Sequence, residues 1–156
     1  MEIPGALFTD FYQITMLNGY FRSGKHHQRS IYELFFRKIP HQGGYCVAAG
    51  LEQALNYLEQ VHFTPEDLAY LRGLGLFKED FLEWLRGFRF RGEVWAIAEG
   101  TLVFPNEPMM RIHASLPEAQ LVESALLNLI NFQTLVATKA ARIVHAAQDG
   151  VQTGPD

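Results

Sequence analysis

The sequence is poor in cysteine and lacks the common motifs for cofactors and metals. A single cysteine, Cys46, stands among 156 residues, which excludes an internal disulfide framework and favours a reducing compartment. We therefore expect a cytoplasmic protein in which Cys46 is buried filler within its apolar run. Walker-type phosphate loops and the motifs GxGxxG, CxxC and HExxH are all absent. The sequence thus predicts no metal site of its own.

Long apolar runs are also missing. No run approaches the roughly 20 residues needed to cross a bilayer, and the amino terminus lacks a basic region followed by an apolar one, so we expect no membrane span and no signal peptide. The formal net charge of −4 argues against general binding of nucleic acid. Cations nevertheless outnumber anions by five to one between Arg22 and Lys38. Such a segment is either a solvated edge or a place for a small anionic ligand.

What the sequence does have is 48% hydrophobic residues, enough for the core of one globular domain. Its most informative stretch is the start. Thr9 and Asp10 are typical helix caps and predict a helix over residues 10–21. Tyr12 and Gln13 fall off the apolar stripe of that helix, so we expect a partly exposed tyrosine. The expected stripe consists of Phe8, Phe11, Ile14 and Leu17.

The remaining periodicities predict an α+β fold, because helices and strands are not in strict βαβ alternation. Residues 88–91 also alternate in the β manner, and the last helix is expected to break near Asn131. We expect an amino-terminal α/β domain over residues 1–116, a helical segment over 117–148 and a disordered tail over 149–156. The expected strands are 30–37, 45–49, 93–98, 102–104 and 109–115, and the further helices are 51–60, 65–72, 78–85 and 117–147.

Two clusters could carry binding chemistry. Arg37 and Lys38 end a hydrophobic strand, where cations can hold phosphate or carboxylate oxygens, or can simply emerge into water. Thr138 and Arg142 are four residues apart and share a helix face, and Lys139 lies beside them. Cations there also suit the negative end of a helix dipole, so a packing role remains equally open.

Six segments in this order resemble the amino-terminal part of nicotinate phosphoribosyltransferase, and together they extend from about Phe8 to Ala147. One such segment would be weak, but six in the same order are specific. They are residues 9–13, 33–38, 50–51, 99–100 with 104–108, 128–133 and 137–142.

The resemblance implies an activity and a fold. That family makes nicotinate mononucleotide from nicotinate and phosphoribosyl pyrophosphate in NAD salvage. ATP hydrolysis is coupled to the step, and Mg²⁺ accompanies the pyrophosphate. Family members are homodimers whose active sites lie at the subunit interface. The implied fold is the mixed helix and antiparallel-strand amino-terminal domain of a type II phosphoribosyltransferase, followed by the first long helices that lead toward an incomplete α/β barrel.

The resemblance also implies site residues. Tyr12 corresponds to a residue that contacts nicotinate across the dimer interface, where an aromatic ring can stack on the flat pyridine. Arg37 and Lys38 match a basic pair that faces anionic substrate. Thr138 and Arg142 lie on the helix that leads into the barrel, as substrate contacts or as packing residues.

No catalytic residue is assigned. None of the six histidines matches the family's catalytic histidine, which is phosphorylated in the ATP-coupled cycle, and the arginine-rich phosphate-binding segment is missing as well. We therefore expect a fragment or a truncated reading frame without transferase activity of its own, and with an exposed apolar patch around residues 126–136. The alternatives are a relative that uses nicotinamide or quinolinate, and a non-catalytic binding or dimerisation module.

Overall fold

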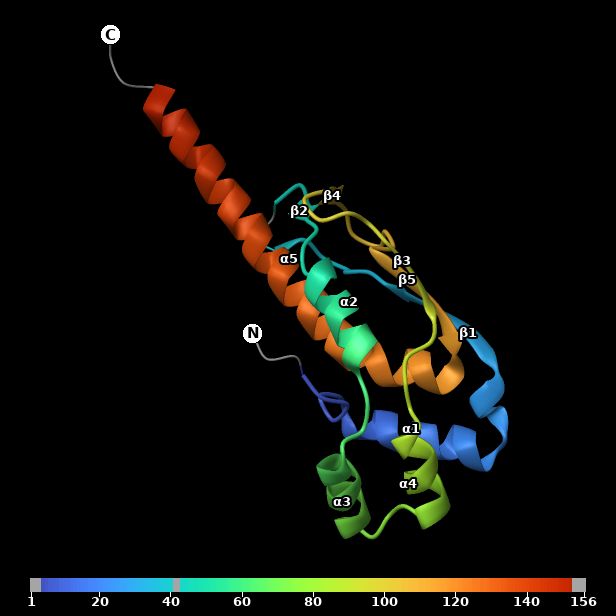
Figure 1. The fold of residues 1–156 in the computed structure, drawn as a ribbon. Coiled ribbons are helices and arrows are strands. Elements are labelled where there is room, and N and C mark those ends of the chain that lie inside the picture. The colour runs from blue at the N-terminus through green and yellow to red at the C-terminus, as the bar shows by residue number, and fades with distance from the viewer. Residues whose placement is uncertain (1–3, 41–42, 153–156) are drawn as a thin grey trace.

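The computed structural model describes residues 4–40 and 43–152 and has an α+β fold, as the sequence predicts (Figure 1). Within this part, helices and short antiparallel strands surround one long carboxyl-terminal helix. In chain order the elements are α1 (Phe11–Arg22), the 3₁₀ turn η1 (Lys25–His27), β1 (Arg29–Leu34), β2 (Cys46–Val47), α2 (Leu51–Gln60), α3 (Pro65–Gly73), α4 (Glu79–Arg86), β3 (Glu93–Ala96), β4 (Leu102–Val103), β5 (Met110–Ser115) and α5 (Leu116–Gln152).

The strands form two antiparallel sheets. One has the order β1-β5-β3, and the other pairs β2 with β4. In β5, Met110, Ile112 and Ala114 are buried and alternate with more exposed residues. This period of two gives the larger sheet one face toward the core, where β1 and β5 pack against α5.

Local signals account for the helices around the sheets. Thr64 and Asp67 form a reciprocal capping box at the start of α3, with Pro65 in the first turn. The amide groups of Gly50 and Leu51 at the start of α2 donate to Glu99 Oε1 at 2.6 and 2.7 Å. Helices α2 and α3 therefore begin where their unpaired N–H groups find a side-chain acceptor.

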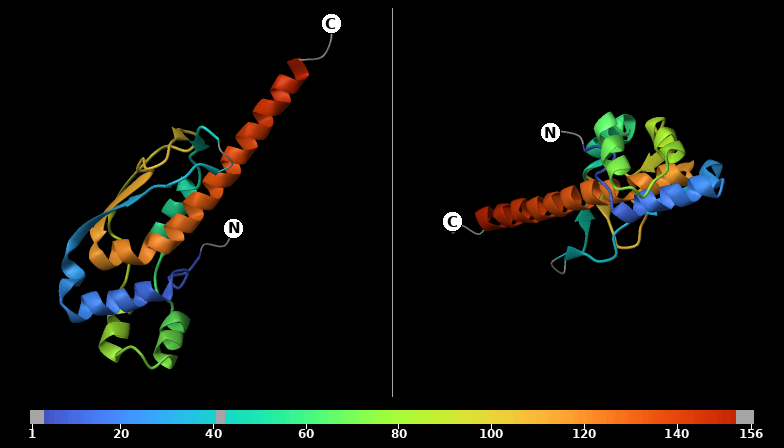
Figure 2. Two further views of the ribbon diagram at one scale, coloured as in Figure 1. Left: turned by 180° about the vertical axis from the view of Figure 1, so that it is seen from behind. Right: turned by 90° about the horizontal axis from the view of Figure 1, so that it is seen from below.

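Helix α5 is the central element. Its first half packs against α1, α2 and both β1 and β5, and its second half extends beyond the sheets (Figure 2). Gly50 permits the close approach of α2, because its φ is 97° and a Cβ there would lie 2.9 Å from the carbonyl oxygen of Leu129. By length and mean hydropathy, 1.2 over its most apolar window, α5 could cross a membrane. The core helix of a soluble protein can have the same length and hydropathy.

Four expectations about elements are corrected by the structure. The first expected strand ends at Leu34, because β5 begins at Met110 and offers no partner beyond it. Residues 88–91 lie outside any strand, since β3 begins only at Glu93. Helix α5 continues unbroken past Asn131. It also extends to Gln152, so residues 149–152 are helical and do not form the expected tail. The remaining residues of that expected tail, 153–156, lie outside the described part.

The expected stripe of α1 is only half right. Ile14 and Leu17 are buried, but Phe8 and Phe11 are about half exposed. Gln13, expected to lie off the stripe, is fully buried. The face of α1 that packs inward is therefore set by polar partners on α5 as well as by apolar side chains.

Candidate functional site

Tyr12 lies in the first turn of α1 with 48% of its surface exposed, as the sequence predicts. Its hydroxyl oxygen accepts a hydrogen bond from Gln13 Nε2 at 2.8 Å. Partial desolvation raises the pKa of the Tyr12 phenol, and the nearby carboxylates of Glu123 and Asp10 raise it further. The phenol is therefore neutral at physiological pH, with its ring accessible and its hydroxyl held.

A buried polar network holds the Gln13 amide. Gln13 Nε2 also donates to Glu123 at 3.2 Å, and the amide of Gln120 donates to the Gln13 oxygen. The hydroxyls of Tyr32 and Tyr20 donate to the Gln120 oxygen at 2.8 and 3.2 Å. Sequence reasoning missed this network, because its members are distant in the chain and only tertiary packing joins them.

The residues expected to cap α1 are bound to α5 instead. The Thr9 hydroxyl donates to the Leu121 carbonyl at 3.2 Å, and the Ser124 hydroxyl donates to Asp10 Oδ2 at 2.7 Å. No side-chain cap hydrogen bond is present at Asp10. The segment before α1 is thus fixed to α5, which orients the first turn that carries Tyr12.

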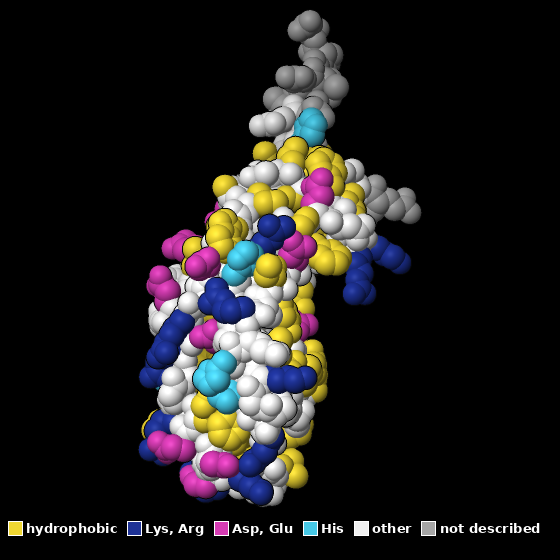
Figure 3. All heavy atoms as spheres, turned by 90° about the vertical axis from the view of Figure 1, so that its right-hand side faces the viewer, with side chains coloured by type: hydrophobic (Ala, Val, Ile, Leu, Met, Phe, Trp, Pro, Cys, Tyr) yellow, Lys and Arg dark blue, Asp and Glu magenta, His cyan; other side chains and the backbone are white. Residues whose placement is uncertain are grey.

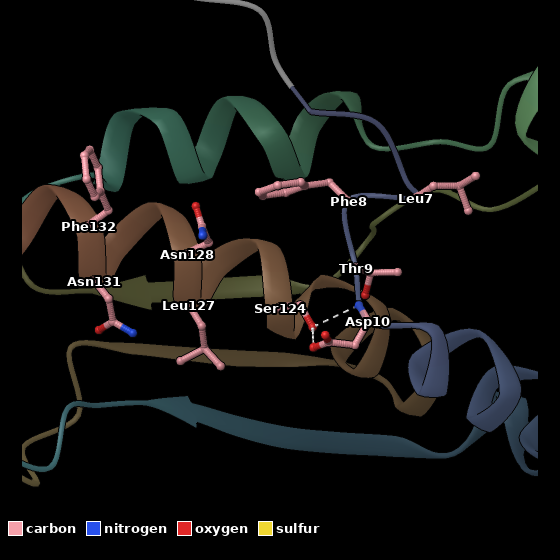
Figure 4. A pocket seen from close by; sticks show the side chains of 9 residues that line it. All are labelled: Leu7, Phe8, Thr9, Asp10, Ser124, Leu127, Asn128, Asn131 and Phe132. Atoms are coloured by element: carbon pink, nitrogen blue, oxygen red, sulfur yellow. Dashed lines mark hydrogen bonds between the residues drawn. The ribbon is translucent and has the colours of Figure 1, made fainter.

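An open hollow of about 610 Å³ lies between that segment and α5 (Figure 4). Its wall on the α5 side carries Asn128 and Asn131, whose amides make no hydrogen bond to any described residue. Phe8 and Phe132 supply apolar surface, and Asn128 and Phe132 project toward the Phe8 side. Tyr12 does not line this hollow. Asn128 and Asn131 belong to a segment of the resemblance, but no pattern in the sequence marks them as binding residues.

Thr138 is buried inside the fold rather than facing a ligand. Its hydroxyl donates to the Thr134 carbonyl at 2.6 Å and accepts from the Val47 amide at 2.9 Å. One turn earlier, the Thr134 hydroxyl bonds both backbone groups of Ala49 at 3.2 Å. The two threonines therefore attach the backbone around β2 to α5, which is the packing role of the two open alternatives.

Arg142 also binds backbone. It donates to the carbonyls of Pro40 at 3.3 Å and Tyr45 at 3.0 Å, with its guanidinium carbon 6.0 Å from the centre of the Tyr45 ring. Gly43 leaves the room for it, because a Cβ there would overlap the guanidinium group. Arg142 thus holds the segment before β2 against α5, and a substrate contact by this residue stays a prediction.

Arg37 and Lys38 lie in the bend after β1, and both are exposed. Within residues 4–40 and 43–152, neither makes a hydrogen bond or an ion pair. Because Arg142 binds Pro40, this basic pair lies near the Arg142 end of the molecule. A contact of this pair with an anionic substrate stays a prediction.

The predicted site residues thus fall into two groups. Tyr12 lies beside Glu123, and Arg37, Lys38 and Arg142 lie near Thr138. Fifteen residues of helix separate Glu123 from Thr138, which corresponds to about 22 Å along α5. Tyr12 and Thr138 are therefore held at separate turns of α5.

The described residues also do not suit the Mg²⁺ that the resemblance implies. They contain no group of three or more His, Cys, Asp or Glu side chains arranged to hold a metal ion. The Mg²⁺ and ATP implied by the resemblance stay predictions.

Comparison with known proteins decides the family. Residues 7–131 match the model of the nicotinate phosphoribosyltransferase (NAPRTase) N-terminal domain, which is most of the chain. This chain belongs to the nicotinate phosphoribosyltransferase family. Its segment order agrees with that assignment, and the fold described here is that of the family's amino-terminal domain.

Individual relatives agree with this assignment to the nicotinate phosphoribosyltransferase family. A nicotinate phosphoribosyltransferase of Bacillus subtilis is 53% identical over 146 residues, which is 94% of this chain and 30% of the relative. The pncB2 enzyme of Mycobacterium tuberculosis is 49% identical over 92% of this chain and 31% of its own length. The crystal structure of human nicotinic acid phosphoribosyltransferase superposes with a TM-score of 0.83 at 35% identity, over 95% of this chain and 29% of the human one. The chain therefore spans about three tenths of the length of the curated relatives it matches.

Proposed function

We propose that this chain is the amino-terminal domain of a nicotinate phosphoribosyltransferase and that Tyr12 is its contact to nicotinate. The complete enzyme joins nicotinate to phosphoribosyl pyrophosphate in the cytoplasm, with ATP hydrolysis and Mg²⁺. The observation that carries the role of Tyr12 is its geometry. A half-exposed ring whose hydroxyl is fixed by a buried amide is a preformed surface for a flat ligand.

The role of Tyr12 in this proposal is to bind and orient. A stacked aromatic pair contributes about 0.5–1.5 kcal/mol beyond the area it buries. The hydrogen bond from Gln13 restricts the position of the phenol before the ligand arrives, so less conformational freedom is lost on binding. The chemistry of phosphoribosyl transfer is assigned to residues outside this chain.

The separation of the two groups of predicted site residues supports a shared site in a homodimer. Tyr12 lies beside Glu123, about 22 Å along α5 from Thr138, and Arg37 and Lys38 belong to the group near Arg142. A second subunit can bring Tyr12 of one copy to a site on the other. Arg37 and Lys38 would then be free to approach phosphate or carboxylate oxygens of the substrates.

The deciding experiment is a chimera in which residues 1–148 replace the corresponding segment of the Bacillus subtilis relative. Formation of nicotinate mononucleotide is measured as a function of nicotinate concentration. We expect Tyr12→Ala to raise the KM for nicotinate about tenfold, and Tyr12→Phe to retain most of the stacking. Tyr70→Ala is the matched control, because Tyr70 is exposed on α3. Equal KM values for the Tyr12→Ala and Tyr70→Ala chimeras would overturn the role of Tyr12.

A titration of the 156-residue chain, followed by NMR, does not depend on the chimera folding. Nicotinate should shift the amide signals around Tyr12 more than nicotinamide or quinolinate does, and Tyr12→Ala should abolish the shifts. A stronger response to quinolinate or nicotinamide would favour the related enzymes instead. The chain alone should form no nicotinate mononucleotide, and turnover near that of a full-length relative would refute its proposed non-catalytic role.

A non-catalytic dimerisation module is the second candidate. The observation that favours it is the exposed apolar surface on the second half of α5, which includes Phe132, Val136 and Ile143. Such a module would self-associate and show no selective response to nicotinate. The nicotinate titration of the same sample therefore separates the two proposals.

A further inference from the structure

A second hollow, of about 460 Å³, lies at the end of the molecule where η1, the segment after α4 and the start of α5 meet. Its size is that of a site for a small molecule. Three arginines line it, namely Arg29, Arg89 and Arg91. Figure 3 looks onto this edge, where histidine side chains lie among arginine and lysine side chains. Neither the family assignment nor the proposed role of Tyr12 uses these residues.

The charge of this hollow is opposite to that of the chain. The whole sequence carries a net charge of −4, but the hollow has three arginines against one carboxylate, Glu118. Among the described residues, Arg29, Arg89 and Arg91 form no ion pair. Arg89 makes one bond, from Nη1 to the Phe88 carbonyl at 2.5 Å, and its other donors stay available. Unpaired guanidinium groups that converge on a hollow attract an anion.

The Glu118 carboxylate accepts hydrogen bonds from neutral donors and forms no ion pair with the three arginines, so it offsets only one of their three charges. One oxygen accepts from the amide and hydroxyl of Ser115 at 2.9 and 2.7 Å, and the other accepts from the Arg91 amide at 3.2 Å. These bonds also fix the segment of Arg91 against the start of α5. Glu118 thus binds the backbone amide of Arg91 and not its guanidinium group.

The fold builds this arrangement from distant segments. Arg29 pairs with Ser115 in the β1–β5 register, which places it at the start of α5. Gly92 lets the segment of Arg89 and Arg91 lie directly against β5, because a Cβ there would come within 2.7 Å of Ala114. The three arginines therefore come together through tertiary structure and do not belong to one basic segment of the sequence.

The remaining wall suits a polar ligand with an apolar part. The ring of His26 lies edge-on to Trp84 at 5.6 Å, and its Nδ1 is buried without a hydrogen-bond partner. The start of the long helix α5 adds the partial positive charge of its amino-terminal end, although Glu118 occupies part of it.

We infer that this hollow binds the phosphate group of a small phosphorylated molecule, with Arg29, Arg89 and Arg91 donating to the phosphate oxygens. Guanidinium groups bind phosphate through paired, charge-assisted hydrogen bonds, which lysine does not reproduce. The inference goes beyond the proposed function and stands independently of whether Tyr12 binds nicotinate.

The test uses tryptophan fluorescence of the 156-residue chain. Trp84 lines the hollow and Trp95 lies on β3, so Trp95→Phe leaves Trp84 as the only tryptophan. Inorganic pyrophosphate, AMP and ATP are titrated at constant ionic strength, with sodium chloride as the reference. We expect a saturable change with pyrophosphate. If AMP or ATP binds more tightly than pyrophosphate, the hollow also recognises the nucleoside part of a nucleotide. If all three bind equally well, the hollow recognises the phosphate group alone.

Variants assign the effect to the arginines. Arg89→Gln with Arg91→Gln should weaken pyrophosphate binding by about tenfold or more, because two charge-assisted contacts are lost. Arg86→Gln removes one positive charge from the exposed surface of α4, outside the hollow, and should leave the affinity within about twofold. An unchanged affinity in the double variant would overturn the inference. An equal loss in Arg86→Gln, or no saturable change with pyrophosphate, would overturn it as well.

Discussion

The two halves of α5 have similar apolar composition but very different surroundings. In the first half, Leu121, Val122 and Leu126 are at most 2% exposed, because α1, α2 and the larger sheet surround them. In the second half, Leu135, Val136 and Ile143 are between 42% and 60% exposed. The helix continues regularly through both. Helix formation is therefore a local property here, and burial depends on which elements the rest of the fold brings to each turn.

The difference also separates two kinds of attachment. The first half of α5 is held by apolar packing and by the buried network beneath Tyr12. The second half is attached by individual hydrogen bonds. Thr134, Thr138 and Arg142 each bind the backbone of the segment from Pro40 to Ala49. Stability should therefore depend on side-chain volume in the first half and on individual hydrogen bonds in the second.

The largest effect is expected from truncation in the first half. Leu121→Ala should lower the free energy of unfolding by about 2–5 kcal/mol, because Leu121 is fully buried and its removal leaves a cavity. Leu135→Ala makes the same chemical change in the second half, where the side chain is 42% exposed, and should cost about 1 kcal/mol or less. Urea denaturation followed by circular dichroism measures both. Equal losses would contradict the comparison.

A smaller effect is expected from Thr138→Val. The substitution keeps the shape of the side chain but leaves the Val47 amide without its acceptor, which should cost about 1–3 kcal/mol. Thr138→Ser retains the hydroxyl and serves as the control. Hydrogen exchange should accelerate at the Val47 amide in the valine variant alone. Unchanged protection at Val47 would show that the hydrogen bond does not hold β2.

Surface changes in the second half should hardly alter stability. Val136→Ser with Ile143→Ser should shift the free energy of unfolding by about 0.5 kcal/mol or less, because both side chains are more than half exposed. The same variant should reduce self-association, measured by sedimentation velocity, if this apolar face joins two copies. A wild-type chain that stays monomeric at every concentration would refute association through α5.

The smallest effect is expected from an exposed ion pair far from α5. A hydrogen bond from Arg72 holds the pKa of Glu79 below its ordinary value, so the pair stabilises the fold at neutral pH and loses its contribution as the pH falls through the lowered pKa. Both side chains are exposed, so the change should be slight. The urea midpoint of unfolding is measured as a function of pH, and Glu79→Gln should reduce its fall at acidic pH. If the midpoint of Glu79→Gln still falls steeply with decreasing pH, another group causes that fall.

Much of the fold follows from local signals. The capping sequence at Thr64 predicts the start of α3, and the period of two in residues 110–115 predicts β5. The errors share one cause. Residues 35–37 have the composition of a strand, but beyond Leu34 they make one backbone bond, from the Asn106 amide to the Phe36 carbonyl, instead of a continued ladder. Asn131 interrupts the apolar pattern without interrupting the helix. The local sequence pattern of a segment does not specify which other segments it will pair with or pack against.

For the candidate site, the sequence by itself determined that Tyr12 is an exposed aromatic residue in the first turn of a helix, and the order of its segments determined the family. Only the folded structure shows that Gln13 is buried and binds the Tyr12 hydroxyl, and that Thr138 and Arg142 bind backbone. It also places Thr138 about 22 Å along α5 from Glu123, the residue beside Tyr12. The physical reason is that exposure and helical phase arise within one helix, whereas a hydrogen bond between residues 100 positions apart exists only after folding has brought them together.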